Sequence, residues 1–203
     1  MRALILIDLQ YDFMPGGALG VAEGDQVVPI ANRLQECFDL VLATQDWHPP
    51  DHSSFARNHP GHQIGEVIDI DGMAQMLWPA HCVQNTDGAG LVTTLVKSGI
   101  SRIFYKGTNP AIDSYSAFFD NAHRRATGLG EHLNNAAVDE IFLMGLATDY
   151  CVKFSALDAV GLGLRTHVIS EGCRGIDLRP GDVERAWAEM ALAGVSVVSE
   201  ADL

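Results

Sequence analysis

The chain has 203 residues, a length at which one domain can bury a sizeable core, and no shift in composition marks a second domain. Its formal net charge is −13 and its 13 lysine and arginine residues are scattered, which argues against a nucleic-acid-binding surface. No apolar run could span a membrane, no signal peptide precedes the first predicted strand, and the cysteines form no CxxC pair. We therefore expect one cytoplasmic domain, residues 1–203, with reduced thiols and with neither nucleic acid nor membrane as a partner.

The apolar pattern predicts strands that alternate with helices. In chain order it predicts strand 2–7, helix 24–37, strand 40–45, an irregular stretch 46–87, helix 89–98, strand 102–105, an irregular stretch 107–120, helix 121–136, strand 140–144, helix 149–160, strand 165–169, helix 180–193 and strand 195–198. The predicted strands are almost continuously apolar, which is typical of a parallel sheet with helices on both faces. The predicted fold class is therefore α/β, a three-layer sandwich around an open, mostly parallel sheet.

The stretch 46–87 is too long for an ordinary connection, since loops in compact domains have a median length of about 4–6 residues. It also holds most of the histidines of the chain, namely His48, His52, His59, His62 and His81. We interpret it as a functional loop.

Charged side chains end several of the predicted strands. Asp8 follows the first strand, Asp46 the second, and Lys106 the third. Ligands of open parallel sheets bind at the carboxyl ends of the strands, so we expect these side chains to meet at one edge.

Cys151 lies where the strand 140–144 breaks at Gly145 and a helix begins. The first turn of a helix favours a thiolate and can lower a cysteine pKa from ~8.5 towards 7. Cys151 is thus a candidate nucleophile, and the alternative is a small buried apolar residue.

Asp46 and His48 are two residues apart on an extended segment, so both side chains can point the same way. With His81 they would offer one carboxylate and two imidazoles, a set that suits Zn²⁺, Fe²⁺ or Mn²⁺. The alternative is that these are solvated loop histidines.

Five motifs occur in order along nearly the whole chain: LIDLQYDF at 6–13, TQDWHP at 44–49, WPAHCV at 78–83, YKG at 105–107 with DSYSAF at 113–118, and GLATDYCV at 145–152. In these motifs the chain resembles the nicotinamidases, a metal-dependent group of the isochorismatase-like cysteine hydrolases, whose fold is Rossmann-like. The DWHP and WPxHCV motifs distinguish that group from metal-free relatives.

The resemblance implies a catalytic triad of Asp8, Lys106 and Cys151, in which the cysteine attacks the carboxamide carbon, the aspartate moves the proton and the lysine holds both partners. It also implies an oxyanion hole made by the backbone N–H groups of Ala147 and Cys151, with a cis peptide between Leu146 and Ala147.

The resemblance further implies one divalent transition metal ion, Zn by preference with Fe or Mn as alternatives, bound by Asp46, His48, His81 and water. His52 would either ligate the ion or donate a hydrogen bond to one of its waters. Three aromatic residues, Phe13, Trp78 and Tyr115, match positions that flank the substrate ring, with plain core packing as the alternative.

The function implied is hydrolysis of nicotinamide to nicotinate and ammonia, a step of NAD salvage, with pyrazinamide as an analogue substrate and a homo-oligomer as a further expectation. One alternative is another amidase of the superfamily that acts on a carbamoyl or ureido group. The other is a non-catalytic metal-binding or thiol-redox module.

Overall fold

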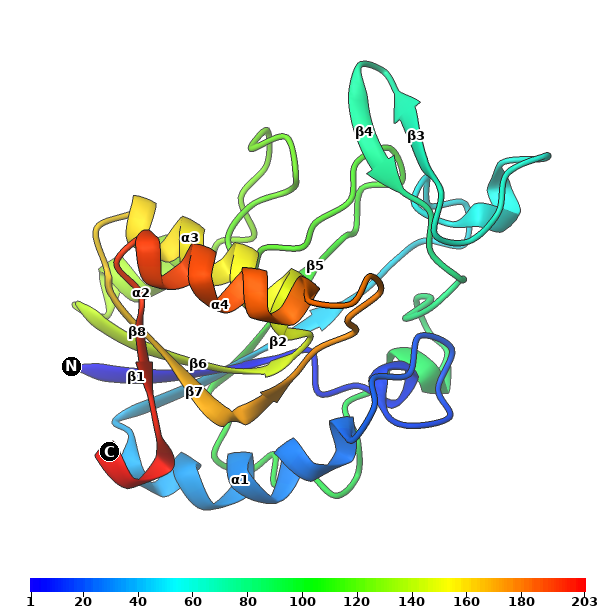
Figure 1. The fold of residues 1–203 in the computed structure, drawn as a ribbon. Coiled ribbons are helices and arrows are strands. Elements are labelled where there is room, and N and C mark those ends of the chain that lie inside the picture. Colours follow the sequence, from blue (N-terminus) through cyan, green and yellow to red (C-terminus); the bar gives the residue numbers. More distant parts are fainter.

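A six-stranded sheet runs through the centre of the protein, whose computed structural model describes residues 1–203 (Figure 1). The strands lie in the order β5-β2-β1-β6-β7-β8, and every neighbouring pair is parallel. They are β1 (Arg2–Ile7), β2 (Leu40–Asp46), β5 (Arg102–Lys106), β6 (Glu140–Leu146), β7 (Arg165–Arg174) and β8 (Ser196–Val198). The central strands are buried on both faces, as their continuous apolar sequences predict.

Helices cover both faces of this sheet. Helix α1 (Val27–Leu34) lies on one face, and α3 (Lys153–Gly161) and α4 (Asp182–Leu192) lie together on the other (Figure 1). The short helix α2 (Leu129–Asn135) precedes β6 and buries two leucines in the core. The predicted three-layer α/β sandwich is therefore confirmed. The longest helix has 11 residues, and none is both long and apolar enough to cross a membrane.

A glycine allows β6 to pass close to β1 just before the predicted nucleophile. Gly145 pairs with Ile7 and has φ of +132°, and a Cβ at this position would lie 2.1 Å from the Ile7 carbonyl oxygen. No larger residue fits there without moving a central strand. The position of the following turn relative to β1 is fixed in this way.

The predicted helix 89–98 is wrong. This stretch forms turns, in which the Val92 N–H donates to the Leu9 carbonyl oxygen and Leu91 forms a bridge with Gln10. Leu91, Val92 and Leu95 are buried, so their apolar spacing marks contact with the core. The run of β-branched residues at 92–94 disfavours a helix, which the apolar spacing alone did not reveal.

Several other boundaries differ from the prediction. The predicted helix 24–37 is an α-helix only over α1, with 3-10 turns on either side, and the predicted strand 140–144 continues through Gly145 as β6. Only the second half of the predicted helix 121–136 is helical, as α2, and the predicted strand 165–169 extends to 174. The predicted helix 149–160 opens with a π-helical turn, Thr148–Val152, before α3. The long loop 46–87 contains an antiparallel hairpin, β3 (Val67–Ile70) and β4 (Met73–Met76), which stands clear of the main sheet (Figure 1).

Candidate active site

Four chemically active side chains meet at the carboxyl edge of the sheet, as predicted. Asp8 follows β1, Asp46 and Lys106 end β2 and β5, and Cys151 lies in the turn after β6. All four are buried, with exposed fractions between 0 and 5%. Charged groups excluded from water in this way must be compensated by one another or by a bound ion.

Lys106 joins the other three. Its Nζ lies 2.9 Å from Asp8 Oδ2 and 3.4 Å from Cys151 Sγ, and it donates a hydrogen bond to Asp46 Oδ1. Burial favours the neutral amine, but Asp46 and Asp8 outweigh it and hold the pKa of Lys106 well above its ordinary value. Lys106 is therefore a fixed cation between two carboxylates and a thiol.

The two carboxylates differ in proton affinity. Burial raises the pKa of Asp8 above its ordinary value, and the nearby Asp46 carboxylate adds to that rise against the opposing Lys106. Burial also disfavours the Asp46 carboxylate, but Lys106 and His48 hold the pKa of Asp46 well below its usual range. Asp46 therefore stays ionised, and Asp8 is the carboxylate with the pKa that suits proton transfer.

The expectation that the helix start lowers the pKa of Cys151 is wrong for the resting site. Burial raises the pKa of this thiol well above its ordinary value, and the opposing effect of Lys106 does not compensate. The Asp8 carboxylate further disfavours a second negative charge beside it. Cys151 therefore rests as a thiol, and a base must take its proton when it attacks.

The turn that carries Cys151 has an unusual backbone. The Leu146–Ala147 peptide is cis, as the resemblance implied. The Ala147 carbonyl oxygen accepts the N–H groups of Tyr150 and Val152, both at 3.1 Å, while the Ala147 N–H donates to no other group of the protein. A free N–H next to the nucleophile is the kind of donor that an oxyanion requires.

A second group of ligand-type side chains adjoins the first. The Nε2 atoms of His48 and His81 lie 3.5 and 3.8 Å from Asp46 Oδ2, and ligand atoms of all three residues lie within 4.8 Å of one another. Loop residues from both ends of 46–87 thus meet at one point. For these histidines the alternative of solvated loop residues is wrong.

Each of these imidazoles is oriented by a backbone carbonyl. His48 Nδ1 donates to the Gly107 oxygen at 2.9 Å and His81 Nδ1 to the Pro79 oxygen at 2.8 Å. A carbonyl only accepts, so the neutral ring keeps its free lone pair on Nε2, which faces Asp46. Burial lowers the pKa of His81 to about 4, which keeps the His81 lone pair free at neutral pH. Burial also disfavours the charged form of His48, but the Asp46 carboxylate outweighs burial and raises the pKa of His48 above its ordinary value. The donor set fits one divalent transition ion.

His52 is also enclosed at this site. It is fully buried, its Nδ1 lies 2.7 Å from Ser54 Oγ, and its buried Nε2 has no partner in the protein. Burial lowers the pKa of His52 to about 4. By contrast, His62 is exposed beside Glu66, and His59 Nε2 donates to the Ser53 carbonyl oxygen; neither residue belongs to the cluster. Three of the five loop histidines therefore gather here.

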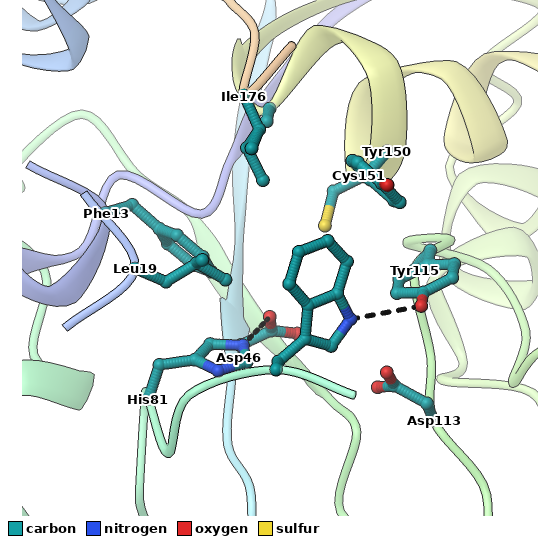
Figure 2. Close-up of a pocket in the computed structure, with 11 residues that line it drawn as sticks. Phe13, Leu19, Asp46, His81, Asp113, Tyr115, Tyr150, Cys151 and Ile176 are labelled. Carbon is teal, nitrogen blue, oxygen red and sulfur yellow. Dashed lines mark hydrogen bonds and ion pairs between the residues drawn. The ribbon is translucent and has the colours of Figure 1, made fainter. Parts of the chain in front are cut away.

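A pocket of about 320 Å³, including its mouth, opens between the nucleophile and these ligand-type residues. Its walls include the three predicted aromatic residues, and Trp78 Nε1 donates to Tyr115 Oη at 3.1 Å. In Figure 2, Asp46 and His81 lie at one end of the pocket, and the Cys151 sulfur points into it from beside Tyr150. Phe13 and Trp78 are also buried, so each of these side chains both packs in the core and lines the pocket.

The chain is similar to known proteins over nearly its whole length. The isochorismatase domain family matches residues 2–202. The chain belongs to the isochorismatase-like hydrolase family. It is 50% identical to a nicotinamidase of Escherichia coli (strain K12), over 99% of this chain and 96% of that protein.

Solved structures of the same family agree with this assignment. A nicotinamidase and pyrazinamidase of Acinetobacter baumanii superimposes with a TM-score of 0.96 at 45% identity, over 99% of this chain and 97% of that one. A pyrazinamidase of Pyrococcus horikoshii, solved in complex with zinc, has a TM-score of 0.79 at 37% identity, over 98% of each chain.

Four pocket residues of this family member were missed by the sequence analysis: Leu19, Asp113, Tyr150 and Ile176. Tyr150 directly precedes Cys151 in the motif GLATDYCV, and Asp113 is the first residue of the motif DSYSAF. Their places in these motifs could have identified them. Leu19 and Ile176 lie in irregular segments outside any motif. Only the folded chain shows that they reach the pocket.

Proposed function

We propose that the protein hydrolyses nicotinamide to nicotinate and ammonia, with Cys151 as the nucleophile. The observation that carries this proposal is the convergence of two groups on one aromatic pocket: the triad Asp8, Lys106 and Cys151, and the ligand set Asp46, His48 and His81. The similarity to nicotinamidases over nearly the full length of both chains supports it.

The ligand set would hold one divalent ion, and we propose zinc, with iron or manganese as alternatives. The zinc complex of the Pyrococcus horikoshii relative supports that choice. When bound, the ion would offer an open position to the pyridine nitrogen and so anchor the ring. Phe13, Trp78 and Tyr115 would contact the two faces and the edge of a flat heteroaromatic ring.

The triad would then carry the chemistry. Asp8 takes the proton of the Cys151 thiol as the sulfur attacks the carboxamide carbon, and the N–H groups of Ala147 and Cys151 receive the developing oxyanion. Asp8 next gives that proton to the departing nitrogen, ammonia leaves and a thioester remains. Asp8 then takes a proton from the water that attacks the thioester and passes it to the sulfur as the C–S bond breaks, which restores the Cys151 thiol. The acid that is released loses its carboxyl proton to solvent and becomes nicotinate.

Lys106 has an electrostatic role in this scheme. Its cation lies within 3.4 Å of the sulfur and 2.9 Å of the Asp8 carboxylate, so it offsets negative charge on whichever of them carries it. It also remains charged throughout, because its pKa is held well above its ordinary value by the two carboxylates. Proton transfer between Asp8 and Cys151 therefore takes place beside a constant positive charge.

Pyrazinamide is a second proposed substrate, since it has the same flat shape and a ring nitrogen in the same relation to the carboxamide. Carbamoyl and ureido substrates are less well supported. They would use neither the ligand set nor the aromatic walls, both of which are buried and preorganised here. A non-catalytic module would have no use for a buried lysine bonded to a nucleophile and a base.

Ammonia release from a small panel of amides tests the proposed function. The panel contains nicotinamide, pyrazinamide, benzamide and a carbamoyl amino acid, each with the metal-loaded protein. We expect turnover of nicotinamide and pyrazinamide and much slower turnover of benzamide, which lacks the ring nitrogen. Preferential turnover of the carbamoyl compound would contradict the proposal.

The metal ligands make a separate prediction. His81→Ala removes one imidazole, and we expect metal affinity to fall by more than the ~10–100-fold that loss of an outer hydrogen bond causes. Nicotinate binding should weaken in parallel. Metal content after gel filtration and calorimetry with nicotinate measure both effects. His62→Ala, which alters an exposed histidine of the same loop, is the control. Full metal occupancy in His81→Ala would refute the assignment.

His52 is expected to act more weakly than His81. The Ser54 N–H points at His52 Nδ1 from 3.3 Å, so Nδ1 accepts and Nε2 carries the hydrogen. A buried N–H beside the ligand set would donate to a water of the ion. We therefore expect His52→Ala to lower metal affinity by about 10–100-fold, measured by competition with a chelator. A loss as large as that of His81→Ala would make His52 a direct ligand.

A further inference from the structure

One wall of the pocket comes from the segment that follows β7. Ile176 lies on this segment and points into the pocket from the end opposite Asp46 and His81 (Figure 2). Its side chain is partly buried, and no motif of the sequence indicates that it lines the pocket. The nitrogen end of a bound ring would face Asp46 and His81, so Ile176 would face the opposite edge of the ring.

Ile176 is held in place by the turn that carries the nucleophile. Asp149 belongs to that turn and is only 4% exposed. Its Oδ1 accepts the Ile176 N–H and its Oδ2 accepts the Asp177 N–H, both at 2.9 Å. One carboxylate thus fixes two consecutive backbone groups of the pocket segment, and hydrogen bonds to a carboxylate are about twice as strong as neutral ones.

The same segment has little room to move towards α4. A Cβ at Gly175 would lie 2.2 Å from Val183 Cγ2 of α4 and 3.1 Å from Asp149 Oδ1. The Asp177 side chain in turn accepts the Val183 N–H at 3.3 Å. The segment is therefore enclosed between α4 and the turn of Cys151, and the backbone that carries Ile176 is held at a defined place relative to the nucleophile.

We propose that Ile176 determines which ring substituents the enzyme accepts, and that Asp149 is the positioning residue that sets this limit. The inference rests on the proposed function. The substrates favoured are flat N-heteroaromatic amides without a substituent on the edge remote from the ring nitrogen, at carbons 4 and 5. Substituents beside the nitrogen face another part of the pocket and do not meet Ile176.

The test compares kcat/KM for nicotinamide with that for its 5-methyl and 6-methyl derivatives. In Ile176→Ala we expect the ratio for the 5-methyl compound over nicotinamide to rise about 10-fold or more, the effect of accommodating one carbon group. The ratio for the 6-methyl compound, whose substituent lies beside the nitrogen, should stay unchanged. Leu178→Ala is the control, because this side chain is on the same segment and 41% exposed outside the pocket.

Asp149→Asn tests the positioning role, because an amide can accept at only one of its two atoms. We expect the 5-methyl ratio to shift in the same direction as in Ile176→Ala, with KM for nicotinamide rising more than kcat falls. A fall in kcat with an unchanged ratio would show that Asp149 only supports the nucleophile turn and would overturn its positioning role.

Unchanged ratios in Ile176→Ala, with wild-type turnover of nicotinamide intact, would overturn this inference and leave the proposed function in place. Absence of wild-type turnover would overturn the proposed function itself.

Discussion

Replacing Cys151 by alanine is expected to abolish ammonia release from nicotinamide, with a rate loss of about 10⁴-fold or more, as removal of a nucleophile causes in other hydrolases. The sulfur lies 3.4 Å from Lys106 Nζ and faces the pocket, and no other thiol does so. Metal content and nicotinate binding should persist, because neither the ligand set nor the aromatic walls change. Steady-state assays and calorimetry on the same preparation measure both.

Cys173→Ala is the matched control for this variant. Cys173 is also a 5% exposed thiol, lies on β7 and does not line the pocket. Burial raises the pKa of Cys173 to about 12, so it is no thiolate at neutral pH either. We expect the control to keep its turnover with at most a small loss of stability from the removed sulfur. Ammonia release by Cys151→Ala at a rate near that of the control would refute the mechanism.

Lys106→Met has the second largest expected effect. Without Lys106, the Asp8 carboxylate loses the cation that contacts it at 2.9 Å, while burial continues to raise its pKa. Asp8 then holds a proton at neutral pH and cannot accept the thiol proton. We expect the rate to fall by about 10²–10⁴-fold, the contribution of general acid–base catalysis, while nicotinate still binds. Lys153→Met, which removes a lysine of α3 that pairs with Glu189 of α4, is the control.

The pH dependence of the rate should change in a defined direction in this variant. Asp8 must be ionised and one proton must remain on the Asp8 and Cys151 pair, so kcat/KM should rise and then fall with pH. The rising limb should lie above the ordinary aspartate pKa because burial raises the pKa of Asp8. In Lys106→Met that limb should move to still higher pH. An unshifted limb with retained turnover would show that Lys106 is a structural ion pair only.

Loss of folding would imitate the rate effect, because two buried carboxylates lose their partner. Removal of one member of a buried ion pair costs about 3–5 kcal/mol. Thermal unfolding of Lys106→Met, with and without nicotinate, separates the two cases. A folded variant that binds nicotinate and does not turn over nicotinamide supports the electrostatic role.

The sequence predicted much of the fold and most of the site because the local apolar pattern of each strand agrees with the place of that strand in the sheet. Strands buried on both faces must be continuously apolar, so their polar ends stand out, and Asp8, Asp46 and Lys106 were found in this way. The convergence of His81 with His48 depends on the path of a long loop. The residue pattern made these histidines candidates and left solvated loop residues as an alternative, and the motif resemblance then indicated that they converge.

The errors also have physical causes. The apolar spacing of 89–98 is produced by turns that pack against the core, and periodicity does not distinguish these from a helix. The pKa of Cys151 depends on burial and on Asp8, which the position of a residue in its segment does not reveal. Ile176 reaches the pocket through backbone hydrogen bonds to Asp149 that no side-chain pattern encodes.

The thioester at Cys151 is the central claim, and rapid-quench mass spectrometry of the enzyme during turnover of nicotinamide tests it most directly. Acid quenching within the first turnovers, followed by proteolysis, should give the peptide containing Cys151 with the added mass of one nicotinoyl group. The adduct should be absent in Cys151→Ala and should disappear as substrate is exhausted. Turnover with no acylated Cys151 peptide at any time, or with the nicotinoyl group on another residue, would contradict the account.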